Sequence, residues 1–297
     1  MTDETGTSTA GTRTRIGVRK TYKLYIGGKF PRSESGRSFE VHDPSGAFLA
    51  NASLASRKDA RDAVVAARKA FPRWSGATAY NRGQVLYRVA ELLEGRHAQF
   101  ADEVARGEGL SPQEAAAVVD AAVDRWVWYA GWTDKVAQVH GSSNPVAGPY
   151  FDFSLPEPMG VVAVLAPQES SLLGLVSVVA PALATGNTVV VLASERAPLP
   201  AVTLSEVLAT SDVPGGVVNV LTGRTAEVAP WLASHMDVNA IDLQGAPAQA
   251  VRDLEVAAAD NLKRVVRPSA TDWTVDPGTS RLLAYVETKT VWHPIGI

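Results

Sequence analysis

The stretch EPMGVVAVLAP, residues 157–167, decides the fold class of this chain. Its apolar centre, residues 161–166, follows a Pro-Met-Gly turn and stops at a second proline. A short continuous apolar run between turn residues is typical of a strand that is buried on both faces of a parallel sheet. An apolar helix from about Leu172 to Ala184 follows, and a second buried strand comes at 188–192. The pattern therefore predicts a β-α-β unit.

The same rhythm continues toward residue 266. Further candidate strands at 217–221, 240–243 and 263–266 alternate with helical patterns. Five strands with crossover helices predict a doubly wound parallel (Rossmann-like) α/β sheet. In such sheets ligands bind beyond the carboxyl ends of the strands, so the loops at 167–171 and 193–198 are where function should be sought first.

Other elements flank this sheet. A capping box at Ser56–Asp59 and a Ser-Pro-x-Glu start at Ser111 predict N-terminal helices. Period-2 alternation at 150–155 predicts a strand outside these helices, and 282–292 reads as a lone final strand that needs a sheet edge to join. Residues 1–20 are rich in Thr, Ser and Gly and predict a disordered tail.

Composition excludes several classes of function. The chain has 297 residues, 46% of them hydrophobic, and a formal net charge of -3, which supports neither a nucleic-acid nor a membrane-surface role. No apolar stretch is long enough to span a bilayer and no signal-peptide pattern is present, so we expect a cytoplasmic protein. The absence of cysteine excludes disulfides, thiolate metal sites and a cysteine nucleophile. The five histidines are scattered, and we expect no metal site.

Several motifs together resemble the aldehyde dehydrogenase superfamily. They are YIGGKF (25–30), EPMGVV (157–162), APALATGNTVV (180–190) and PGGVVNVLTG (214–223), which occur in that family's order and at its usual spacing. The resemblance runs from about residue 22 to 266. Residues 285–292 also resemble the family's C-terminal oligomerisation strand.

The resemblance implies a division of the chain into domains. Family members are NAD(P)-dependent oxidoreductases with a dinucleotide-binding domain, a catalytic domain that carries a cysteine nucleophile, and a small oligomerisation sheet. By that comparison the chain lacks the catalytic domain. The implied parts are the tail (1–20), a dinucleotide-binding-type domain (21–266) with oligomerisation strands at 145–156, a linker in place of the catalytic domain (267–280), and a C-terminal oligomerisation strand (281–297).

The resemblance also implies that the family's chemistry is depleted. Where the family has Pro-Trp-Asn, with the asparagine helping to form the oxyanion hole, this chain has Pro167-Gln168-Glu169. A carboxylate ~4 Å from a developing oxyanion repels it by roughly 4 kcal/mol at an effective dielectric near 20. The family's general-base glutamate falls near Pro268, so no catalytic residue is assigned.

Cofactor binding is implied at only two positions. The family's Lys-Pro-Ser-Glu, which holds the adenosine ribose, reads Leu192-Ala193-Ser194-Glu195 here, and only the acid remains. The phosphate-binding Gly-Ser step reads Gly245-Ala246-Pro247, without the hydroxyl and with a proline that lacks an N–H. Glu195 and Gly245 are the cofactor-binding residues by family position. We expect no cofactor, and NAD(P) if there is any.

Three hypotheses for function follow. The first is a catalytically inactive pseudoenzyme that forms a hetero-oligomer with a full-length aldehyde dehydrogenase. The second is a working NAD(P)-dependent oxidoreductase acting on aldehydes, which turnover by the isolated chain would reveal. The third is a nucleotide-binding remnant, which NAD titration would reveal. Ser170 and Ser171 are expected to cap the following helix, because no histidine base lies nearby in the sequence.

Overall fold

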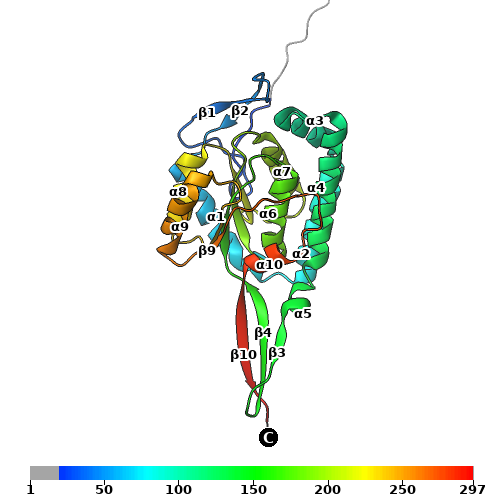
Figure 1. Ribbon diagram of the computed structural model, residues 1–297, viewed down its shortest axis with the longest axis vertical. Helices are drawn as coiled ribbons and strands as arrows, with labels where there is room; N and C mark the ends of the chain where they lie inside the picture. Colours follow the sequence, from blue (N-terminus) through cyan, green and yellow to red (C-terminus); the bar gives the residue numbers. More distant parts are fainter. Residues whose placement is uncertain (1–19, 297) are drawn as a thin grey trace, which may run out of the picture.

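The computed structural model describes residues 20–296, and its centre is a five-stranded parallel sheet (Figure 1). The strands lie in the order β7-β6-β5-β8-β9. Strands β6 and β7 extend the sheet from β5 to one edge, and β8 and β9 then extend it from β5 to the other edge. This order confirms the predicted doubly wound α/β fold. The strand bounds are β5 Val161–Leu165, β6 Thr188–Leu192, β7 Val218–Leu221, β8 Ala240–Asp242 and β9 Arg264–Val266.

Helices cover both faces of the sheet. Val162 and Val164 of β5 pack into one hydrophobic cluster, whereas Val161 and Leu165 pack into another on the opposite face. All residues of β5 are buried, which explains why its sequence has no polar side. The first cluster contains α2 (Ala79–Glu94), α4 (Pro112–Trp132), α6 (Leu173–Ala184) and α7 (Leu199–Thr210), and the second contains α1 (Arg57–Ser75), α8 (Thr225–Ser234) and α9 (Val251–Ala259).

The starts of the N-terminal helices confirm the capping predictions. At α1 the Ser56 hydroxyl accepts the N–H of Asp59 and the Asp59 carboxylate accepts the N–H of Ser56, at 3.3 and 2.8 Å. Ser111 and Glu114 form the same capping box at α4. Helix α3 (His97–Glu108) was not predicted. Its N-cap has no side-chain hydrogen bond, so no start signal marks it in the sequence.

The segment before α1 attaches to the edge of the main sheet. Ile26 and Lys29 exchange backbone hydrogen bonds across the Gly27-Gly28 turn, and Tyr25 pairs with Val220 of β7. A hairpin of β1 (Ser38–His42) and β2 (Phe48–Ser53) follows. The predicted tail of residues 1–20 lies, apart from its last residue, outside the described residues.

A second sheet projects from the body as a long arm (Figure 1). Its strands are ordered β10-β4-β3, and β10 pairs antiparallel with the whole of β4. Its elements are β3 Ser142–Asn144, β4 Tyr150–Pro158 and β10 Val286–Pro294, and α5 (Val136–His140) leads into it.

The prediction of a strand over 282–292 is wrong at its start. Residues Ser280–Ala284 form helix α10, and β10 begins only at Val286. The reason lies in the tertiary structure: Leu282 and Tyr285 are fully buried in the main core, and the Asn187 side-chain amide donates to the carbonyl of Tyr285 at 2.8 Å.

Two kinds of feature are absent from residues 20–296. None of their helices is long and apolar enough to cross a membrane. None of their His, Asp and Glu side chains gather in a group of three that could hold a metal ion.

Candidate functional site

An open cleft of about 840 Å³ lies at the carboxyl ends of β5, β6 and β8, where the fold predicts a ligand site. Both loops expected to carry function contribute to it, the first through Pro167, Gln168 and Glu169 and the second through Glu195 and Arg196. Gly245 also lines the cleft. The structure therefore brings Glu195 and Gly245, the two residues assigned by family position, to one cleft. Their role in cofactor binding stays a prediction.

Gln168 ties the two loops together. Its side-chain oxygen accepts the N–H of Glu195 at 2.8 Å, and its amide nitrogen donates to the carbonyl of Ala166 at 3.0 Å. The Ser194 hydroxyl donates to the Gln168 carbonyl at 3.0 Å. All polar groups of the Gln168 side chain are thus used to hold backbone. We conclude that Gln168 builds the cleft and does not point a free amide into it.

Glu169 stands at the rim and not inside the cleft. Its side chain is 77% exposed and forms an ion pair with Arg196. This neighbouring cation offsets part of the repulsion that Glu169 would exert on an anion in the cleft.

Glu195 is engaged within the chain. Its carboxylate accepts from the guanidinium of Arg224 at 2.8 Å and from the N–H of Thr225, the first residue of α8, at 2.9 Å. Burial tends to raise the pKa of the Glu195 carboxyl, but the hydrogen bonds from Thr225 and Arg224 outweigh burial and lower it. Glu195 is therefore ionised and caps a helix, and a ribose hydroxyl would have to share it with both partners.

Gly245 has a structural reason to be glycine. A Cβ at this position would lie 1.9 Å from the carbonyl oxygen of Ala166, far inside van der Waals contact. The Gly245 N–H donates to the carbonyl of Leu165 at 2.9 Å, which holds the two strand ends together. The close approach of the two backbones explains the glycine without a ligand. After it, Pro247 precedes a 3-10 turn (Ala248–Ala250) that leads into α9.

The serines of the first loop do not form a nucleophilic pair with histidine. The Ser170 hydroxyl accepts the N–H of Gly174 at 2.9 Å, which confirms that it caps the first turn of α6. Ser171 differs from the expectation: its N–H and its hydroxyl both donate to Glu108 on α3, at 2.7 and 2.6 Å.

Residues 267–280, the predicted linker, form an ordered closing segment that runs beside the cleft. Thr271 and Trp273 line the cleft directly. Arg125 of α4 is 7% exposed and donates to the carbonyls of Trp273 and Val275 at 2.6 and 2.9 Å. A buried guanidinium with two backbone acceptors is a strong anchor, because its hydrogen bonds are charge-assisted.

A buried polar cluster holds the chain in place directly after the C-terminal end of the closing segment, at Arg281. Asp242, at the end of β8, is fully buried and accepts from Arg281 at 2.6 Å, from the hydroxyl of Tyr285 at 2.5 Å and from the N–H of Gln244 at 2.9 Å. Arg281 also donates to the Gln244 side chain at 2.8 Å. We did not single out this cluster from the sequence. The one available signal was an acid, Asp242, inside an apolar strand, which demands a buried partner.

The comparisons with known proteins agree with this geometry. A model of the aldehyde dehydrogenase family matches residues 30–267. The chain belongs to the aldehyde dehydrogenase family. Among curated members of the family it is 35% identical over 247 residues to the mitochondrial benzaldehyde dehydrogenase of Antirrhinum majus, and 35% identical over 248 residues to retinal dehydrogenase 2 of Homo sapiens. These matches cover 82% of this chain but 46% and 47% of the two relatives.

Solved aldehyde dehydrogenases have the same fold. A putative aldehyde dehydrogenase from Burkholderia cenocepacia superposes with a TM-score of 0.78 at 31% identity, covering 82% of this chain and 49% of the other. An aldehyde dehydrogenase from Bacillus cereus, solved as an NAD+ complex, superposes with a TM-score of 0.79 at 28% sequence identity. This match covers 85% of this chain and 53% of the other. The chain therefore spans about half the length of the family members that it matches.

Proposed function

We propose that this chain is a non-catalytic member of the aldehyde dehydrogenase family that associates with a full-length aldehyde dehydrogenase. The absence of catalysis is supported by the sequence, which has no cysteine to serve as a thiol nucleophile. It is also supported at the cleft. By the family resemblance the general-base glutamate would fall near Pro268, within the closing segment, and this segment brings Thr271 and Trp273 to the cleft.

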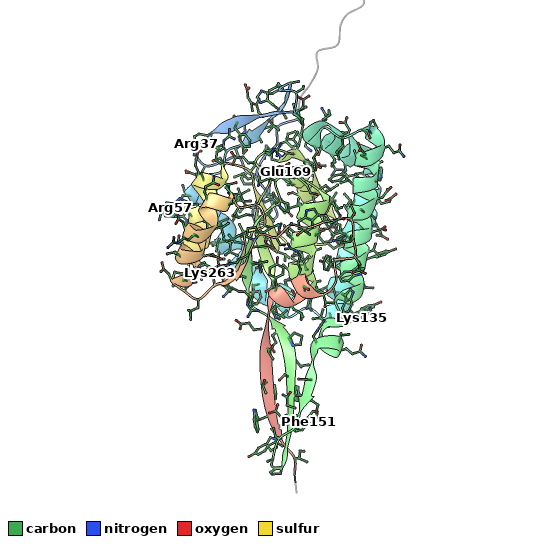
Figure 2. All side chains as sticks on the ribbon, viewed as in Figure 1. Arg37, Arg57, Lys135, Phe151, Glu169 and Lys263 are labelled. Atoms are coloured by element: carbon green, nitrogen blue, oxygen red, sulfur yellow. The ribbon has the colours of Figure 1, made fainter. Side chains whose placement is uncertain are left out.

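The observation that carries the association is the uncovered surface of the projecting arm (Figure 2). Phe151, Leu155 and Trp292 are 49%, 37% and 58% exposed. Large aromatic side chains are enriched at the centres of protein interfaces, where they contribute most of the binding energy. Strand β10 is also an edge of its sheet, and an edge strand with free backbone groups can add a strand from a neighbour.

The partner follows from the family comparison. The resemblance implies that the oligomerisation strand extends a sheet in a neighbour's catalytic domain. This chain matches only about half of its relatives and has no such domain between β9 and α10 to offer to a second copy of itself. A full-length family member supplies that domain.

Co-expression tests the proposal. The chain is produced together with the full-length aldehyde dehydrogenases of its own genome, and complexes are analysed by affinity capture and size-exclusion chromatography with light scattering. We expect a hetero-oligomer that Phe151→Ser weakens and that Tyr87→Ser, which changes an equally exposed ring on α2 (51%), leaves intact. Elution of the chain alone with every candidate overturns the association. Turnover of an aldehyde with NAD by the isolated chain, above a buffer blank, overturns the absence of catalysis.

Nucleotide binding is the second candidate function, and the cleft itself favours it. The cleft is large, and Glu195 is 30% exposed in it. Calorimetric titration of the isolated chain with NAD tests whether the cleft binds the nucleotide. Binding heat that disappears in the Glu195→Gln variant supports a nucleotide-binding remnant. The absence of binding heat at millimolar NAD overturns this second candidate function.

A further inference from the structure

A second cavity, of about 620 Å³, lies at the C-terminal end of α8, against the first turns of α1. It shares no lining residue with the cleft at the strand ends. Its lining includes Arg57, Lys58 and Arg61 of α1, and Trp231 and Met236 from the end of α8 and just beyond it. Arg57 lies on the outer surface of the body in Figure 2. The cavity therefore combines three cations with an apolar wall.

Arg57 lies directly over the ring of Trp231. The carbon of its guanidinium is 3.7 Å from the ring centroid, which is a cation–π contact. Within residues 20–296 no carboxylate forms an ion pair with Arg57, whereas Lys58 and Arg61 are paired with Glu34 and Asp62. The N–H groups of a guanidinium can bind a carboxylate in a bidentate arrangement while its face contacts a ring. Arg57 is thus a cation that lies next to an apolar ring and has no carboxylate partner within residues 20–296.

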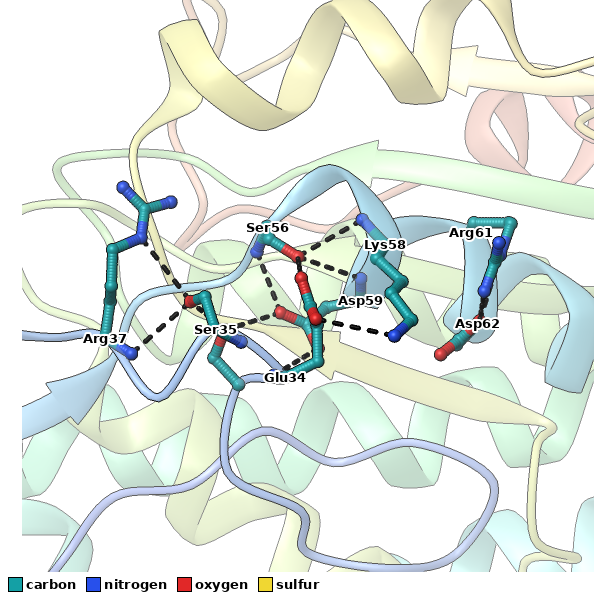
Figure 3. Close-up of polar contacts among 9 residues, drawn as sticks. Glu34, Ser35, Arg37, Ser56, Lys58, Asp59, Arg61 and Asp62 are labelled. Atoms are coloured by element: carbon teal, nitrogen blue, oxygen red, sulfur yellow. Dashed lines mark hydrogen bonds and ion pairs between the residues drawn. The ribbon is translucent and has the colours of Figure 1, made fainter.

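The chain already places one carboxylate in this cavity. The Glu34 carboxylate accepts from the hydroxyl of Ser56 at 3.1 Å and pairs with Lys58 at 3.4 Å (Figure 3). The N–H groups of Lys58 and Asp59 at the start of α1 are used by Ser56. The cavity therefore offers side-chain cations to an anion, and the helix start itself is satisfied.

The apolar lining residues determine what else the ligand carries. Trp231 and Met236 are 40% and 68% exposed, and both line the cavity. An exposed indole and a flexible thioether next to a guanidinium suit an anion with an apolar body better than a small inorganic ion. The cavity is large enough for such a molecule, because small-molecule sites commonly measure about 300–1,000 Å³.

We propose that this cavity binds an organic carboxylate, with the carboxylate on the Arg57 guanidinium and the apolar body against Met236 and the exposed part of Trp231. The proposal stands on the residues of α1 and α8 and does not depend on the association proposed above. A single charged contact and a small apolar body predict weak binding, with a Kd on the order of 1 mM.

Ligand-detected NMR and calorimetry test it on the full chain, with benzoate and hexanoate as probes. We expect both to bind, Arg57→Gln to weaken them by about tenfold or more, and 0.5 M NaCl to weaken them too. Arg88→Gln, which removes an exposed arginine that pairs with Glu91 on α2, should leave binding unchanged. Both arginines are on the surface, and circular dichroism checks that each variant is folded.

Two further measurements test whether the carboxylate charge and the apolar lining both contribute to binding. Benzyl alcohol keeps the ring of benzoate without its charge, and it should not bind. Met236→Asp places a carboxylate on the apolar wall and should weaken benzoate, because like charges repel. No binding of either carboxylate at 20 mM (on the order of twenty times the expected Kd) overturns the proposal. So does unchanged affinity in Arg57→Gln, or inorganic phosphate binding as tightly as benzoate.

Discussion

Replacement of Arg281 by leucine should destabilise the protein strongly, and by an amount that depends on pH. Arg281 is the cation that faces Asp242, whose side chain has no exposed surface. Without that cation the fold must either bury an unpaired carboxylate or protonate it. Breaking a buried ion pair by removing one partner typically costs about 3–5 kcal/mol.

The cost of protonation sets a ceiling on the loss. An aspartate with an ordinary pKa of about 3.9 takes up a proton at pH 7 for about 4 kcal/mol, and at pH 5 for about 1.5 kcal/mol. The sign follows from linkage. Burial already raises the pKa of Asp242, and removal of Arg281 raises it further, so stability falls as pH rises through the folded-state pKa. Arg281→Leu should therefore lose about 3–4 kcal/mol at pH 7 and about half of that or less at pH 5.

Urea unfolding followed by tryptophan fluorescence at the two pH values measures the loss. Arg267→Leu is the matched control, because it removes an exposed arginine of the closing segment, and it should change stability little at either pH. The double variant Arg281→Leu with Asp242→Asn should recover most of the loss, since a neutral amide needs no cation. Equal losses at pH 5 and pH 7, or no recovery in the double variant, would refute the reasoning.

Three further predictions concern single side chains. Burial raises the pKa of Glu103, whose buried Oε2 atom has no hydrogen-bond partner within residues 20–296. The acid penalises folding as pH rises through its folded-state pKa, so Glu103→Gln should gain urea stability over wild type at pH 8 and lose that advantage near pH 4. Leu262 has a φ of 57° at the end of α9 and is 93% exposed. Leu262→Gly should therefore stabilise by about 1 kcal/mol, and Leu262→Ala, which keeps the Cβ, should not. Gly245→Ala puts a Cβ into the carbonyl of Ala166 and should destabilise by several kcal/mol or prevent folding, whether or not NAD is present. A folded Gly245→Ala variant with unchanged urea midpoint would contradict that packing argument.

The parts of the fold that the sequence predicted well are those with local causes. The buried strands around Val161 follow from continuous apolar runs, and α1 follows from the Ser56–Asp59 capping box. Helix α3 could not be predicted, because Arg96 offers no cap. The helical conformation around Leu282 could not be predicted either, because burial against residues distant in the sequence determines it.

The candidate site was predictable in place but not in detail. The strand ends located the cleft, and the family comparison located Glu195. The partners of Glu195 were out of reach, because Arg224 lies 29 residues away in the sequence. The same holds for Asp242 and Arg281, which are 39 residues apart and belong to segments with no local pattern in common. Ion pairs between distant residues leave no periodic signal in a sequence.

The two ends of the closing segment lie close together in space. The side chain of Gln244 donates to the carbonyl of Ser269 at 2.7 Å and accepts from Arg281 at 2.8 Å, so one glutamine spans the distance between them. A polypeptide of any length that leaves and returns at these two points leaves the five-stranded sheet undisturbed, since closing a longer loop costs little. We therefore expect the exposed turn at Asp276–Gly278 to tolerate the insertion of a foreign domain, such as a fluorescent reporter.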